Sequence, residues 1–93
     1  KVDTREPLVR ARLSQVGEGL QVLVYTPDQK ELFSRICSFF ESISFDIFEA
    51  KVHTTRNGYA LDTFQIQDAS GRQIGYRDLI SYIEYELTAR LAS

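Results

Sequence analysis

The sequence contains no methionine and no tryptophan, and it has a single cysteine, Cys37, among its 93 residues. Because a complete translation product begins with methionine, we expect this chain to be processed or cut from a longer protein. One cysteine cannot form a disulfide within the chain, which favours a reducing compartment. We therefore expect a cytoplasmic protein.

Further absences argue against a membrane protein, a nucleic-acid-binding protein and a metalloprotein. No apolar run approaches the ~20 residues of a membrane-spanning helix, and no secretory signal is visible, so we expect no membrane partner. Lys and Arg are scattered along a chain of formal net charge −2, so we expect no nucleic-acid partner. His53 has no second histidine with which to share a metal ion, and Cys37 lies in the middle of an expected helix, so we predict no metal site.

What is present fits one small soluble domain, with 43% hydrophobic and 26% charged residues. We expect a linker end over residues 1–6 and a single domain over residues 7–93. A chain of this size buries roughly 60–65% of the surface that it exposes when unfolded. Its core must therefore be efficient, or be completed by a neighbouring surface.

The first half of the chain predicts a β-hairpin followed by a helix. Residues 8–14 alternate between apolar and polar, and a turn with two glycines leads into residues 20–26, which are apolar on both faces. Thr26 can cap a helix, with Pro27 at its first position and Gln29 closing a capping box. This helix is expected to end near Ser42. Its apolar stripe consists of Leu32, Phe33, Ile36, Phe39, Phe40 and Ile43.

The second half predicts another hairpin and another helix. Strands are expected over 45–55 and 59–68, joined by the three-residue loop Arg56–Gly58, with a positive φ at Gly58. This register pairs Phe48 with Ile66, Ala50 with Phe64 and Val52 with Asp62, and it leaves Asp62 as a polar misfit that needs a hydrogen-bond partner. A loop over 68–73 precedes a helix from about Tyr76 to Arg90. Tyr82, Tyr85 and Ala89 form a second, weaker stripe on that helix.

The order of these elements predicts an α+β two-layer sandwich of ferredoxin-like type. We expect a four-stranded antiparallel sheet with two helices on one face, and residues 8–14 in the place of the missing final strand. The other face of the sheet is expected to be covered by another copy, another domain or a ligand; the alternative is a face of scattered exposed apolar residues. It is predicted to carry Leu23, Tyr25, Ile47, Lys51, His53, Tyr59, Leu61 and Thr63.

We predict no catalytic residue. His53 and Asp62 are expected on opposite faces of the sheet, so they cannot form a dyad, and Thr54 and Thr55 have no activating base in view. The glycines of residues 68–75 lack the spacing of a phosphate-binding loop.

The runs "YTPDQKELFSRICSFFE" and "FDIFEAKVHTTRNGYALDTFQIQD" resemble an ACT domain. Within ACT domains they are most similar to the first of the two at the C-terminus of the bacterial protein-PII uridylyltransferase/uridylyl-removing enzymes. The resemblance covers about residues 20–90, and its specific part is Ala50–Phe64. Family members often carry a Pro-Gly pair in the loop after the first core strand, where this sequence has Lys30 and Glu31.

The resemblance implies regulation rather than catalysis in this segment. The parent enzymes add uridylyl groups to the signalling protein PII or remove them, are expected to need magnesium, and carry their catalytic motifs upstream. Glutamine acts through the ACT region, and ACT domains bind amino acids where two of them meet, which implies a second ACT domain or a homodimer partner. Implied ligand contacts are Thr26, Asp28, Gln29, Lys30, Phe48 and Ala50. The alternative is a structural module that pairs with another ACT domain and binds no small molecule.

Overall fold

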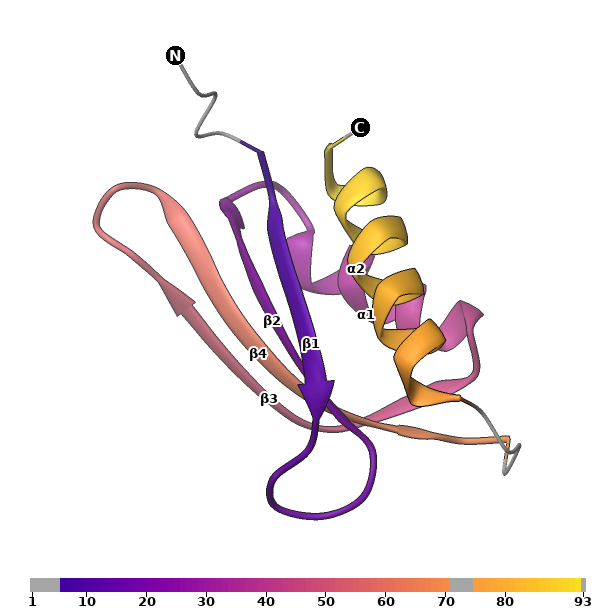
Figure 1. The fold of residues 1–93 in the computed structure, drawn as a ribbon. Coiled ribbons are helices and arrows are strands. Elements are labelled where there is room, and N and C mark those ends of the chain that lie inside the picture. Colours follow the sequence, from indigo (N-terminus) through magenta and orange to yellow (C-terminus); the bar gives the residue numbers. More distant parts are fainter. Residues whose placement is uncertain (1–5, 71–74, 93) are drawn as a thin grey trace.

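Four antiparallel strands form one sheet, and two helices pack on one of its faces (Figure 1). The computed structural model describes residues 6–70 and 75–92, so residues 1–5 of the expected linker and residues 71–73 of the predicted 68–73 loop lie outside the described residues. The elements in chain order are β1 (Leu8–Leu13), β2 (Leu20–Pro27), α1 (Leu32–Ser42), β3 (Phe45–Thr54), β4 (Tyr59–Asp68) and α2 (Tyr76–Ala92). No helix in this part of the chain is long and apolar enough to cross a membrane.

The strand order β1-β2-β4-β3 confirms the predicted ferredoxin-like arrangement. β1 pairs antiparallel with β2 from Leu8 opposite Tyr25 to Leu13 opposite Leu20, and so it occupies the edge where a ferredoxin-like final strand would lie. The core lies between the sheet and the helices. Its fully buried large side chains include Leu20, Ile36, Phe39, Phe40, Phe64, Ile66, Ile83 and Leu87.

The hairpin between β3 and β4 has the predicted loop. The amide of Thr55 donates to the carbonyl of Tyr59 over 2.6 Å, and Gly58 has φ 82°. Near the loop the register is as predicted, with Val52 opposite Asp62. A three-residue loop followed by a strand explains why only glycine fits position 58 without strain.

The register further along β3 differs from the prediction because the strand contains a β-bulge at Phe48. Ile47, and not Phe48, pairs with Ile66, so the predicted Phe48–Ile66 pair is wrong. One extra residue reverses the side-chain alternation beyond it. Ile47 therefore packs against the core, whereas the sequence predicts it on the opposite face, and Phe48 is 52% exposed.

The start of α1 also differs from the prediction. Thr26 and Pro27 continue β2, opposite Ala60 and Tyr59, and the helix begins five residues later at Leu32. Asp28 extends this pairing, since its amide donates to the carbonyl of Gly58 over 2.8 Å. The backbone hydrogen bonds of the sheet thus outweigh the local capping signal at Thr26.

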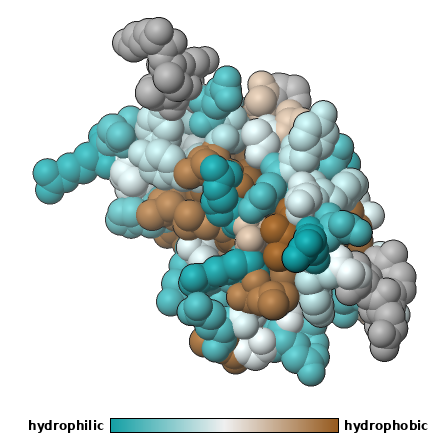
Figure 2. Space-filling model, viewed as in Figure 1, coloured by the Kyte–Doolittle hydropathy of each residue, from teal (hydrophilic) through white to brown (hydrophobic). Residues whose placement is uncertain are grey.

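The two edge strands of the sheet, β1 and β3, differ in how well they are protected against pairing with an added strand. On β1, the amide of Ala11 donates to the Glu84 carboxylate of α2 over 2.9 Å, and Arg10 donates to the carbonyl of Val9 over 3.0 Å. These contacts occupy polar groups that an added strand would use. On β3, residues 48–54 are all exposed. Figure 2, which shows the side of the molecule that carries β1 and α2, has hydrophobic patches interrupted by hydrophilic side chains.

Candidate functional site

The loop between β2 and α1 is held in place through its first two residues, Asp28 and Gln29. Asp28 is bonded to the tip of the β3–β4 hairpin through Gly58. The Gln29 amide group donates to the carbonyl of Leu91 over 3.4 Å and accepts from Arg35, so its side chain joins α1 to α2. Lys30 is exposed. Asp28, another predicted contact residue in this loop, is also exposed, whereas Gln29 is half-buried.

Glu31 ends this loop in a left-handed conformation, with φ 60° and ψ 29°, just before α1. This conformation suits glycine and strains other residues. The Pro-Gly pair that the resembling family often carries would place its glycine at this position. No side chain caps the helix here, and its first turn contains no acidic residue. The amide of Leu32, the first residue of α1, donates to the carbonyl of Gln29 over 3.3 Å, so the amides without a capping side chain are those of the next residues, Phe33 and Ser34.

The two predicted contacts on β3 lie on the exposed part of that strand. Ala50 is exposed opposite Phe64, and Phe33 of α1 stacks on Phe64 with ring centroids 6.0 Å apart. Phe33 is itself 47% exposed. The structure thus brings Ala50 close to the first turn of α1, whereas Phe48 lies further along β3, in the bulge.

A buried polar pair lies on the helix-facing side of the sheet. Thr26 and Asp62 are diagonal neighbours across β2 and β4, and they are 0% and 1% exposed. Thr26 Oγ1 and Asp62 Oδ1 have no hydrogen-bond partner. Burial raises the pKa of the Asp62 carboxyl, and the charge of Asp28 raises it further, while the backbone amide of His53 acts in the opposite direction. The predicted misfit at Asp62 is confirmed, and its Oδ1 lacks the partner that we expected.

The described residues contain no arrangement for nucleophilic or acid–base catalysis. His53 is exposed beside Leu61 on the face opposite Asp62, as predicted. The Thr55 hydroxyl bridges the hairpin, since it donates to the carbonyl of Tyr59 over 3.0 Å and accepts from the Tyr59 amide over 3.2 Å. Burial raises the pKa of the Cys37 thiol, which makes it less reactive. No group of three His, Cys, Asp or Glu side chains in the described ranges could hold a metal ion.

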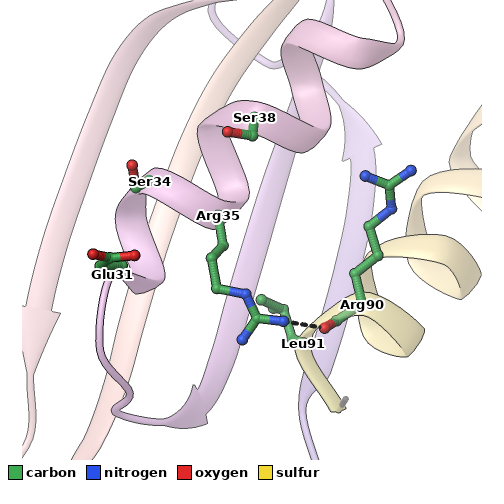
Figure 3. Close-up of a pocket in the computed structure, with 6 residues that line it drawn as sticks. All are labelled: Glu31, Ser34, Arg35, Ser38, Arg90 and Leu91. Carbon is green, nitrogen blue, oxygen red and sulfur yellow. Dashed lines mark hydrogen bonds between the residues drawn. The ribbon is translucent and has the colours of Figure 1, made fainter.

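A polar groove of about 530 Å³ lies between the helices (Figure 3). Arg35 crosses it and donates to the backbone carbonyl of Arg90 over 2.5 Å. The Arg90 guanidinium lies 5.1 Å from the centre of the Phe39 ring. Sequence reasoning missed this groove because its residues come from α1 with the residue before it and from the last turn of α2, which lie far apart in the sequence. Its arginines join α1 to the C-terminal end of α2, so we assign it a structural role.

Comparison with known proteins finds close relatives. The chain is 56% identical over 88 residues to the bifunctional uridylyltransferase/uridylyl-removing enzyme of Thiobacillus denitrificans, which covers 95% of this chain and 10% of that protein. It is 53% identical over 95 residues to the enzyme of the same name from Ralstonia nicotianae, covering 99% of this chain and 11% of the relative. It is 55% identical over 93 residues to the enzyme of the same name from Cupriavidus pinatubonensis, covering 98% of this chain and 11% of the relative.

The chain therefore spans about a tenth of the length of the curated relatives it matches. No family model matches the chain, and no solved structure matches it.

Proposed function

From its homology to a segment of the bifunctional uridylyltransferase/uridylyl-removing enzymes, we propose that this chain is a regulatory ACT domain of such an enzyme. The observation that carries the proposal is 56% identity across 95% of the chain. The fold supports it, because β2-α1-β3-β4-α2 follows the order of elements in an ACT domain. The parent protein would act on PII, and this segment would transmit the nitrogen signal to catalytic residues elsewhere in that protein.

The proposed signal is glutamine, bound where the loop after β2 meets β3. The start of α1 offers backbone amides and the positive end of the helix dipole to the ligand's carboxylate. No side chain caps this end of the helix, and because the Leu32 amide donates to the Gln29 carbonyl, the amides proposed to receive the carboxylate are those of Phe33 and Ser34. The proposed contacts are Thr26, Asp28, Gln29, Lys30, Phe48 and Ala50.

The other half of the site is proposed to come from a second ACT domain at the β3 edge. Three large apolar side chains near this edge are exposed: Phe33 by 47%, Phe48 by 52% and Val52 by 58%. The β1 edge, in contrast, is occupied by Glu84. A half-site must offset the several kcal/mol that immobilising a small ligand costs, so the unpaired chain should bind glutamine weakly.

Calorimetric titration with glutamine tests this proposal in the 93-residue chain and in the full-length protein, with glutamate as the control ligand. We expect saturable binding of glutamine to the paired form only. Val52→Glu should weaken both pairing, measured by sedimentation, and glutamine binding, because it places a charge in the apolar contact. The matched control is Val16→Glu, which changes a side chain that is 77% exposed in the β1–β2 turn and should alter neither. Tight binding of glutamine to a monomer would refute the shared site.

The alternative function is a structural module that pairs with a second ACT domain without a ligand. The bonds of Gln29 to Arg35 and Leu91 favour it, since they commit a proposed ligand contact to the fold. The same titration decides between the two, because pairing without any response of the full-length protein to glutamine is the result expected of the structural module.

A further inference from the structure

The side of the sheet that faces away from the helices, called the outer face below, has a regular arrangement of side chains. Residues paired across neighbouring strands share a face, so the register defines rows that run across the sheet. One row is Leu8, Tyr25, Leu61 and His53. The next row is Arg10, Leu23, Thr63 and Lys51. A third row is Arg12, Gln21, Gln65 and Glu49.

The centre of the outer face is apolar. Tyr25 and Tyr59 stack with ring centroids 4.8 Å apart, and Leu23 beside them is half-buried. Leu8 and Leu61 are 38% and 36% exposed. Such a contiguous apolar surface on a small domain is typical of a binding face.

Basic side chains border this apolar centre on both sides. Arg10 lies on β1 and Lys51 on β3, at the two ends of one row. His53 extends the β3 border by one row. The acidic residues of this face lie on β3 beyond Lys51: Glu49 is in the row next to that of Leu23, and Asp46 lies further along the strand.

The surface between β1 and β4 is also hollowed. A cavity of about 370 Å³ is lined by Arg10, Ala11, Arg12, Gln21, Leu23 and Thr63. The Arg12 side chain is held at the rim of this cavity by a hydrogen bond, in which its Nε donates to Gln21 Oε1 over 2.6 Å. The hollow thus combines an apolar floor at Leu23 with guanidinium groups on the β1 side.

We propose that the outer face binds a short amphipathic helix whose apolar stripe is flanked on both sides by Asp or Glu. The four strands place the basic borders about 14 Å apart, and a helix with its side chains is about 10–12 Å wide. The apolar rows extend about 13 Å along β2 from Pro27 to Leu23. A helix of roughly nine residues has the same length. Carboxylates on either side of the stripe would then meet Arg10 and Lys51.

Two other occupants fit less well. A second copy stacked face to face would bring one basic border against another in either orientation, because both borders are basic. A nucleic acid binds through its phosphates and would leave Tyr25, Leu23 and Leu61 without an apolar partner. This inference does not depend on glutamine sensing or on the β3 edge.

The test compares two labelled peptides of about 14 residues, long enough to form a helix on binding. Both carry the same leucine stripe, flanked in one by glutamate and in the other by lysine. Fluorescence anisotropy should show the glutamate peptide binding about tenfold more tightly, as several close charge pairs give together. The amide signals of Leu23, Leu61 and Thr63 should shift in NMR spectra.

The charge-swapped variant Arg10→Glu/Lys51→Glu should reverse the peptide preference. The matched control is Arg56→Glu/Arg77→Glu, which changes two exposed arginines outside the outer face and should keep it. The peptide comparison on the unchanged chain tests the proposal even if the swapped variant does not fold. Equal binding of both peptides would overturn the proposal, as would displacement of the peptide by inorganic phosphate at matched ionic strength. Concentration-dependent shifts of the same signals without peptide would assign the face to a second copy instead.

Discussion

Gly19, immediately before β2, should be the least replaceable glycine among the four whose surroundings the structure describes. A Cβ built at Gly19 would lie 2.1 Å from the backbone oxygen of Ile66, whereas ordinary Cβ contacts begin at about 3.4 Å. The neighbour is backbone held in the β2–β4 ladder, where Leu20 pairs with Ile66, so it cannot rotate away. Gly19 also has φ 97°, which strains any residue with a side chain.

These two effects set the expected cost of Gly19→Ala. The left-handed backbone costs about 1–2 kcal/mol in a residue with a Cβ. Forcing an extra carbon into a packed site adds about 1–3 kcal/mol. The sum, about 2–5 kcal/mol, is a large part of the 5–15 kcal/mol by which a typical domain is stable. We expect the variant to unfold at much lower urea concentration, or to fail to fold.

Two other glycines separate the cost of the positive φ from the cost of the steric overlap. Gly58 has φ 82° but open space where a Cβ would lie, so Gly58→Ala should cost only about 1–2 kcal/mol. Gly17 has open space and no positive φ, so Gly17→Ala should change stability by no more than about 0.5 kcal/mol. Urea unfolding followed by circular dichroism measures all three. If Gly19→Ala costs no more than Gly58→Ala, the close approach to Ile66 does not matter and the reasoning is wrong.

Other positions give further predictions. Burial raises the pKa of Asp62 in the native state, so between its unfolded and native pKa values the native state binds more protons than the unfolded state. The free energy of unfolding should therefore fall as pH rises through that window from about 4. In urea titrations Asp62→Asn should reduce this fall and the exposed-site control Asp46→Asn should not, so equal pH slopes for the two variants would contradict the assignment to Asp62. Ser44, just after α1, has φ 64°, so Ser44→Gly should stabilise by about 1 kcal/mol and raise Tm by several degrees, and a lower Tm would refute this strain. Glu84→Ala should cost about 1 kcal/mol and speed hydrogen exchange at the Ala11 amide, and unchanged exchange would show that the 2.9 Å bond is not formed in solution.

Local patterns in the sequence were sufficient for most of the fold. The alternation in β1 and the glycine-rich turn after it predicted the first hairpin, because neighbouring strands joined by a short turn pair with each other. The parity of β3 and β4 predicted the loop ending at Gly58, since only that register keeps most apolar residues on one side. The placement of β1 at the edge followed from the element order alone.

The differences arose where one local signal competes with a distant contact. Thr26 has the features of a helix cap, but pairing with Ala60, 34 positions further along, keeps it in β2. The bulge at Phe48 cannot be read from alternation, because both Ile47 and Phe48 are apolar and either could face the core. For the site, the sequence indicated the loop and the strand separately. It did not reveal that Thr26 and Asp62 are buried neighbours, which only the β2–β4 register shows.

The two proposed surfaces use β3 in different directions. Backbone groups at the edge of β3 lie in the plane of the sheet, whereas the side chains of Lys51 and His53 stand perpendicular to it. A second domain paired at the β3 edge would therefore leave the outer face open, and it would place two outer faces side by side in one continuous sheet. Val52 projects on the helix side of that sheet, opposite Asp62. Val52→Glu should consequently weaken pairing without weakening the binding of the glutamate peptide. Arg10→Glu/Lys51→Glu should weaken the binding of that peptide without disturbing pairing. If either change weakens both, the two surfaces are one interface and must be reassigned together.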